Sequence, residues 1–232
     1  PIKAYYELHI EQGPVLELAN NEIGVVTGGQ GVMWNRVRLI GQSAHAGTTP
    51  MNSRINPVLA LSSIVQSLEK IIEQQEGSLY TLGCIKSAPN SINCVTGEVS
   101  FTLDLRHEEN KILNQLQASF ETLIETVCSE SELEFKVDNF WQAPPIVFDE
   151  TCTSTIEKVT QDLGFRYQKI VSGAGHDACQ VARVAPVGMI FIPCEGGLSH
   201  NEAENISPEN AAAGSDVLLH AVLKTTNNYL IQ

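Results

Sequence analysis

The order of the elements predicted between residues 32 and 142 constrains the fold of this chain more than any other feature. Strict alternation over 99–105 predicts a half-buried strand, and apolar residues at helical spacing over 58–72 predict an amphipathic helix. The same criteria predict further strands at 32–40, 79–85 and 133–137 and a second helix at 112–127. The resulting order of strand, helix, strand, strand, helix, strand is the ferredoxin-like βαββαβ unit.

Two breaks flank this unit. Residues 28–31 read Gly-Gly-Gln-Gly and residues 143–145 read Ala-Pro-Pro, and both are typical of hinges. The sequence outside them alternates between predicted strands and helices, which indicates an α/β domain. We therefore expect an α/β chain in which residues 1–31 and 143–232 form one domain and residues 32–142 form an α+β domain inserted into it.

Composition excludes several classes of protein. With 43% hydrophobic and 18% charged residues over 232 positions, the chain can bury a sizeable core. The net charge of −13 argues against nucleic acid and anionic membranes as partners, and no apolar run reaches transmembrane length. Six cysteines without C-x-x-C spacing indicate reduced thiols and a cytoplasmic location. Because the sequence begins Pro1-Ile2-Lys3, without an initiator Met, we expect a piece of a longer polypeptide.

Three histidines lie in segments that resemble functional loops. His200 follows the apolar strand predicted at 187–192, His176 lies in a Gly-rich break, and His9 lies near the end of the first predicted strand, 4–10. Polar residues at the ends of buried strands often face a cleft. We expect these three segments to assemble around one site.

Several motifs, spread over the whole chain, carry a family resemblance. They are residues 7–14 (ELHIEQGP), 45–51 (HAGTTPM), 104–106 (DLR), 172–178 (SGAGHDA) and 199–201 (SHN). Together they resemble the N-carbamoyl-L-amino acid amidohydrolases, a branch of the M20 metallopeptidase superfamily that includes allantoate amidohydrolase and β-ureidopropionase. The resemblance implies a metallopeptidase-like α/β domain with an inserted ferredoxin-like lid through which two copies dimerise. It also implies metal-dependent hydrolysis of a small ureido-carboxylate, releasing ammonia, CO2 and an amino acid.

The resemblance also implies roles for individual residues. His9 and His200 are each implied as a ligand of one of two divalent metal ions, which could be Zn, Mn, Co or Ni. His45, supplied by the lid of the partner subunit, is implied as the donor that stabilises the oxyanion. Arg106 and Asn93 are implied as the clamp on the substrate carboxylate.

Two further residues have weaker assignments. Gln30, at the first hinge, is a candidate for a polar contact with substrate or for ordinary hinge solvation, and the sequence leaves both open. His176 is expected near the site as a substrate-binding residue, with Asp177 orienting its ring.

The chain departs from the family pattern in one respect. The family's His-x-Asp, bridging Asp and Glu pair precede the His9 motif, and no matching residues stand there. Glu108 and Glu109 do not replace the pair, because they are predicted in the first turn of an α+β-domain helix. We therefore expect the C-terminal portion of an enzyme, inactive alone. The alternative is a non-catalytic protein that dimerises or binds small carboxylates. The substrate stays open among N-carbamoyl-L-amino acids, allantoate and β-ureidopropionate.

Overall fold

The computed structural model describes residues 2–230, with the backbone alone for 228–230. The chain forms two compact units. Gly31–Pro145 make up one, which we call the α+β unit, and the residues up to Gln30 together with those from Ile146 onward make up the other, which we call the α/β unit. The sequence had placed these boundaries at 32–142.

The α+β unit has the predicted ferredoxin-like order of elements. These are β3 (Gly31–Ile40), α2 (Pro57–Glu73), β5 (Leu79–Ala88), β7 (Glu98–His107), α3 (Asn110–Glu130) and β8 (Glu134–Ala143). The strands pair in the order β5-β7-β3-β8, and every pair is antiparallel. Glu108 and Glu109 precede α3 rather than lying in its first turn, so that detail of the prediction is wrong.

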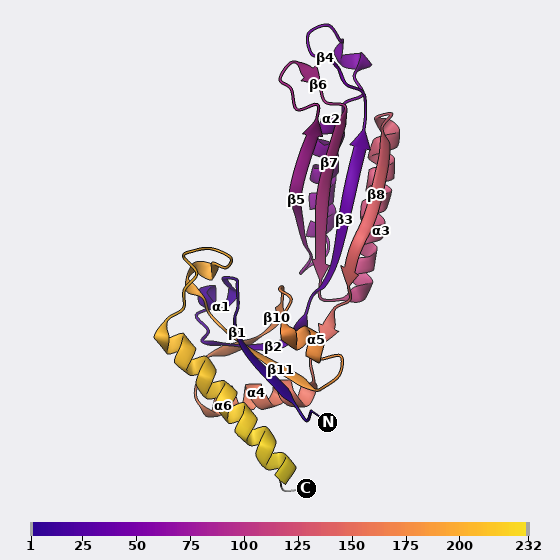
Figure 1. The fold of residues 1–232 in the computed structure, drawn as a ribbon. Coiled ribbons are helices and arrows are strands. Elements are labelled where there is room, and N and C mark those ends of the chain that lie inside the picture. Colours follow the sequence, from indigo (N-terminus) through magenta and orange to yellow (C-terminus); the bar gives the residue numbers. More distant parts are fainter. Residues whose placement is uncertain (1, 231–232) are drawn as a thin grey trace. The chain divides into compact units, whose positions relative to one another are not determined.

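Both long helices of this unit pack on the same face of its sheet (Figure 1). Alternate strand residues such as Val37, Phe101 and Leu103 point into that layer and are fully or almost fully buried. The residues between them, including Trp34 and Arg36, point to the opposite face and are exposed. The strict alternation that predicted the strands therefore separates a packed face from an open one.

A smaller sheet of the same unit lies beyond one end of the four-stranded sheet. It pairs β4 (Ala44–His45) with β6 (Cys94–Val95), and a short 3-10 helix (Met51–Ser53) follows β4. The sequence predicted only a loop here, because strands of two residues carry no periodic signal.

The α/β unit contains a mixed sheet with helices on both faces. Its elements are β1 (Tyr5–Ile10), α1 (Val15–Leu18), β2 (Ile23–Gly29), β9 (Ile146–Val147), α4 (Glu150–Asp162), β10 (Tyr167–Ser172), α5 (Asp177–Val181), β11 (Val187–Ile192), the 3-10 helix η2 (Glu195–Gly197) and α6 (Pro208–Leu230). The strand order is β1-β11-β2-β10, with β9 added on β2. The pairs β1/β11 and β2/β10 are parallel, whereas β11 and β2 run antiparallel. No described helix is long and apolar enough to cross a bilayer.

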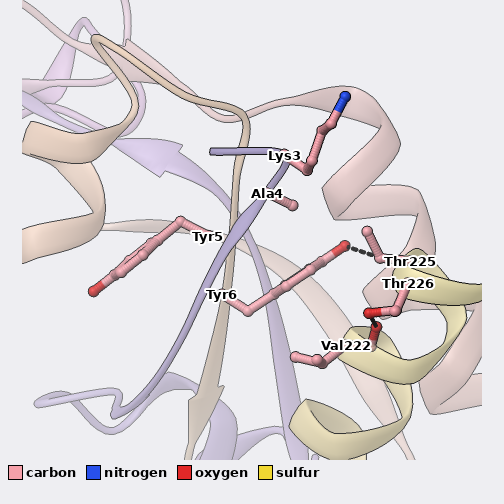
Figure 2. Close-up of a pocket in the computed structure, with 7 residues that line it drawn as sticks. All are labelled: Lys3, Ala4, Tyr5, Tyr6, Val222, Thr225 and Thr226. Atoms are coloured by element: carbon pink, nitrogen blue, oxygen red, sulfur yellow. Dashed lines mark hydrogen bonds between the residues drawn. The ribbon is translucent and has the colours of Figure 1, made fainter. Parts of the chain in front are cut away.

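Alternation along β1 decides which of its side chains are available for function. Tyr6, Leu8 and Ile10 pack with the core beneath α4 and α6. Figure 2 shows Tyr5 and Tyr6 leaving the strand on opposite sides, with the Tyr6 hydroxyl 2.7 Å from Thr225 Oγ1 on α6. The cavity drawn there, of about 350 Å³, therefore lies on the α6 side of β1. The odd-numbered residues of β1 face the other side, where α5 packs.

Candidate active site

His9 and His176 form the centre of the candidate site in the α/β unit. Their rings meet edge to face with centroids 4.6 Å apart. His176 is only 8% exposed, and its Nε2 lies 2.9 Å from Ser172 Oγ. Burial, with a smaller contribution from the neighbouring His9, lowers the pKa of His176 to about 4. The His176 ring is therefore neutral at neutral pH.

Glu7 connects this histidine pair to the start of α5 and to Tyr5 by hydrogen bonds. Its Oε2 accepts hydrogen bonds from the Ala178 N–H (2.6 Å) and the Tyr5 hydroxyl (3.1 Å), and its Oε1 lies 3.9 Å from His176 Nδ1. The sequence had given Asp177 the task of orienting His176. That prediction is wrong about the contact, because the groups facing the two ring nitrogens are Ser172 and Glu7, and Asp177 acts on the ring only through its charge.

His9 has the geometry of a metal-ligating imidazole. Its Nδ1 lies 2.8 Å from the Ile10 carbonyl oxygen, so the neutral ring carries its proton on Nδ1 and leaves the lone pair on Nε2. The loop that carries His200 is joined to the segment after His9, because Gln12 Nε2 donates to Ser199 Oγ at 2.8 Å. The structure thus brings the two predicted metal-ligand segments together.

These residues do not complete a metal centre by themselves. Within residues 2–230, no group of three or more His, Cys, Asp or Glu side chains is placed to hold a metal ion. A catalytic zinc usually takes three protein ligands. His9 fits as one such ligand, but the described residues do not fit a whole centre.

Glu11, which lies within the same motif as His9, stabilises the start of α1. Its two carboxylate oxygens accept the N–H groups of Val15 and Leu16, each at 2.8 Å, at the start of α1. The side chain is buried, and burial raises its pKa while the two N–H groups lower it. Glu11 therefore satisfies backbone donors that the first turn of a helix leaves unpaired.

We expect Glu11→Ala to lower the free energy of unfolding by about 1–3 kcal/mol, because two N–H groups lose their acceptor in a buried setting. Urea denaturation of the purified chain measures this change. Glu202→Ala, which removes an exposed carboxylate, is the matched control and should change stability little. Equal stability of the two variants would show that Glu11 does not hold α1.

Gln30 directly follows β2 and lies beside the same cluster. Its backbone N–H donates to the Ser172 carbonyl at 2.9 Å, and its side-chain Oε1 is buried with no hydrogen-bond partner among the described residues. Leaving such an oxygen unpaired costs about 1–3 kcal/mol. Of the two alternatives, the buried position of Oε1 favours a contact with a bound group over ordinary hinge solvation. The contact with a bound group stays a prediction.

His45 and Asn93 lie together at one end of the α+β unit. The β4/β6 pairing places His45 opposite Cys94, and the Ala46 N–H donates to the Asn93 carbonyl at 3.0 Å. Arg54, which the sequence analysis missed, fixes the loop by donating to the carbonyls of Ala46 (2.6 Å) and Thr49 (3.0 Å).

The His45 ring is held in one tautomer. Its Nδ1 accepts the N–H groups of Gly47 (3.0 Å) and Thr48 (3.2 Å), so the proton of the neutral ring lies on Nε2. The residue is exposed. His45 therefore presents an N–H donor to solvent or to a bound molecule.

Arg106 lies at the other end of the same unit. Its strand neighbours are Val32 and Leu79, whereas His45 and Asn93 lie beyond the Ile40/Glu98 end. Arg106 lies eight positions after Glu98 along β7, about 27 Å at the usual rise per residue. Asn93 and Arg106 of one chain therefore cannot reach the same carboxylate, and their joint clamp stays a prediction that requires two copies of the chain.

Asp104 holds the Arg106 guanidinium. The Nη2 and Nε atoms of Arg106 donate to its carboxylate at 2.7 Å and 3.0 Å, and Trp34 Nε1 donates to the same group at 2.9 Å. The Asp-Leu-Arg motif places both charged side chains on the open face of the sheet, two residues apart. Arg106 is thus a positioned cation and not a freely moving one.

Comparison with known proteins identifies the family of this chain. Residues 1–224 match the model of peptidase family M20/M25/M40, and the chain belongs to that family. It is 44% identical over 223 residues to an N-carbamoyl-L-amino-acid amidohydrolase of Rhizobium meliloti, covering 96% of this chain and 54% of the relative. It is 37% identical over 218 residues to the allantoate amidohydrolase of Escherichia coli, covering 94% of this chain and 53% of the relative.

Solved structures show the same fold. A hydantoinase/carbamoylase family amidase from Burkholderia multivorans superposes with a TM-score of 0.94 at 40% identity, covering 97% of this chain and 55% of that one. The chain thus spans about half the length of the relatives it matches.

Proposed function

We propose that the protein is a metal-dependent amidohydrolase that hydrolyses the carbamoyl C–N bond of N-carbamoyl-L-amino acids, releasing ammonia, CO2 and the amino acid. The names of its relatives support an amidohydrolase. The 44% identity to the Rhizobium meliloti enzyme favours N-carbamoyl-L-amino acids over allantoate, whereas three other such enzymes, at 34–36%, are no more similar than the allantoate amidohydrolase at 37%. The observation that carries the proposal is the His45 tautomer, because a fixed Nε2–H donor is the group that acyl transfer needs at the developing oxyanion.

Arg106 is assigned to the substrate carboxylate. A guanidinium pairs with a carboxylate through two parallel hydrogen bonds, and Asp104 already holds this one in position. His45 and Asn93 lie at the opposite end of the unit, so a site that uses all three residues must draw them from two copies of the chain. We therefore propose a homodimer in which each site combines Arg106 of one copy with His45 and Asn93 of the other.

The α/β unit supplies the remaining groups. His9 and His200 are proposed to offer one imidazole each to two divalent metal ions, whose other ligands are not among the described residues. The neutral His176 and Gln30 Oε1, which has no hydrogen-bond partner among the described residues, are proposed as polar contacts for the ureido group. All six cysteines are free thiols, which supports a cytoplasmic location as part of the proposal.

Ammonia release is the direct test of this function. The protein expressed from its own gene, supplied in turn with Zn, Mn, Co and Ni, should release ammonia from an N-carbamoyl-L-amino acid faster than from allantoate or 3-ureidopropionate. A chelator should abolish the activity. Binding of small carboxylates without any release of ammonia would favour the non-catalytic alternative.

The dimer is a separate prediction. The edge strands β5 and β8 of the α+β unit expose unpaired backbone groups, and such edges often pair with a second copy. Light scattering at micromolar protein concentration should give twice the mass of one chain. A monomeric mass over the whole concentration range would contradict the two-copy site.

A further inference from the structure

A pocket of about 250 Å³ opens on the exposed face of the α+β sheet. Trp34 and Phe140 are among its aromatic lining residues, and its other lining residues include Thr81, Gly83, Thr102 and Asp104. Its volume is below the roughly 300–1,000 Å³ of pockets that hold drug-sized ligands. A pocket of this size suits a group as large as one side chain.

Three exposed aromatic residues gather beside this pocket. A bulge in the β3/β8 pairing at Trp34 lets the consecutive residues Phe140 and Trp141 both approach Trp34, with ring centroids 6.0 Å and 4.5 Å away. The Arg36 guanidinium lies 4.7 Å from the Phe140 ring. Trp34, Phe140 and Trp141 are 38%, 42% and 44% exposed, and a contiguous exposed aromatic cluster of this kind marks a binding surface.

Asp104 connects this pocket to Arg106. It lines the pocket, accepts a hydrogen bond from Trp34 Nε1 and also holds the Arg106 guanidinium. Arg106 lies two residues further along the same face of β7, about 7 Å away at the usual rise per residue. A cation that can pair with a carboxylate and an apolar pocket therefore lie within the reach of one amino-acid-sized molecule.

We propose that this pocket binds the apolar or aromatic side chain of the N-carbamoyl amino acid whose carboxylate pairs with Arg106. This inference rests on the proposed function and narrows its substrate class. Allantoate and 3-ureidopropionate have no apolar side chain to fill the pocket, so they gain nothing from it. Trp34 and Phe140 are thus specificity-determining residues.

Intrinsic fluorescence tests the pocket without any need for turnover. The sequence contains two tryptophans, Trp34 and Trp141, and both belong to the aromatic cluster. Titration with N-carbamoyl-L-phenylalanine should change the tryptophan emission saturably. Its Kd should be lower than that of N-carbamoylglycine by about tenfold or more, because even one methylene in an apolar pocket is worth roughly tenfold or more.

Phe140→Ala removes one wall and leaves both tryptophans as reporters. This variant should raise the Kd for N-carbamoyl-L-phenylalanine to near that of N-carbamoylglycine and leave the latter unchanged. Ile85→Ala is the matched control, since it removes an exposed apolar side chain of the same sheet that does not line the pocket. Circular dichroism and thermal melting confirm that both variants are folded.

The outcomes separate this inference from the proposed function. Equal Kd values for the two ligands, no binding of either, or an unchanged preference in Phe140→Ala would overturn the pocket assignment, even if ammonia is released from both. A preference that depends on Phe140, without ammonia release from any N-carbamoyl amino acid, would support the pocket and contradict the proposed activity.

Discussion

Replacing His45 with alanine is expected to lower kcat by about a hundredfold or more, with little change in KM. The physical reason is the fixed tautomer, because the Gly47 and Thr48 N–H groups occupy Nδ1 and leave Nε2–H as the donor. A donor that acts on charge formed only in the transition state contributes to kcat and not to ground-state binding. Steady-state kinetics of ammonia release measures both parameters.

Two further variants sharpen this test. His220→Ala removes another exposed histidine, on α6 of the α/β unit, and should leave kcat unchanged. His45→Gln keeps an N–H donor on a side chain of similar length and should lose less activity than His45→Ala. If His45→Ala raised KM alone, His45 would be a substrate-binding residue and its assignment to the oxyanion would be wrong.

Arg106→Lys is expected to raise KM by a factor of about 5–150, equivalent to about 1–3 kcal/mol of binding free energy. The lysine keeps the charge but loses the planar fork that pairs with a carboxylate and with Asp104. The Kd of N-carbamoylglycine, measured by tryptophan fluorescence, should rise in parallel.

Arg38→Lys is the control for this change. Arg38 forms a similar pair with Glu98 on the same face of the sheet, at the opposite end of β3 and β7, and its replacement should leave KM unaltered. An unchanged KM in Arg106→Lys would remove Arg106 from the carboxylate site.

Sequence reasoning predicted the α+β unit well because its strands alternate strictly. Burial along β7 follows the apolar positions residue by residue, and α2 and α3 bury the faces that their spacing indicated. Strand direction carries no such signal, so the mixture of the parallel pairs β1/β11 and β2/β10 with the antiparallel pairs β11/β2 and β2/β9 could not be predicted. The short strands β4 and β6 were missed because two residues cannot show a period.

For the candidate site, the sequence predicted which segments come together but not all of the contacts between them. The motif residues His9 and His200 lie on joined segments, as expected, but Glu7 and Ser172 were missed as the groups around His176. Glu7 could have been found, because it is two residues before His9 on the same strand face. Ser172 could not, since its contact depends on how the loop after β10 folds.

Strand length also limits how Asn93 and Arg106 can share one ligand. The strand predicted at 99–105 lies between these two residues, and an extended strand of that length keeps its two ends far apart. Spacing along an antiparallel strand is therefore a direct limit on which side chains can share one ligand.

The central claim is that His45 of one chain and Arg106 of another act on the same N-carbamoyl amino acid, and subunit mixing tests it most directly. His45→Ala and Arg106→Ala proteins, each nearly inactive, are unfolded together and refolded at equal concentration. Random pairing makes half of the dimers mixed, and each mixed dimer has one intact site, so ammonia release should recover to about a quarter of the wild-type rate. A mixture no more active than its two components would contradict the account.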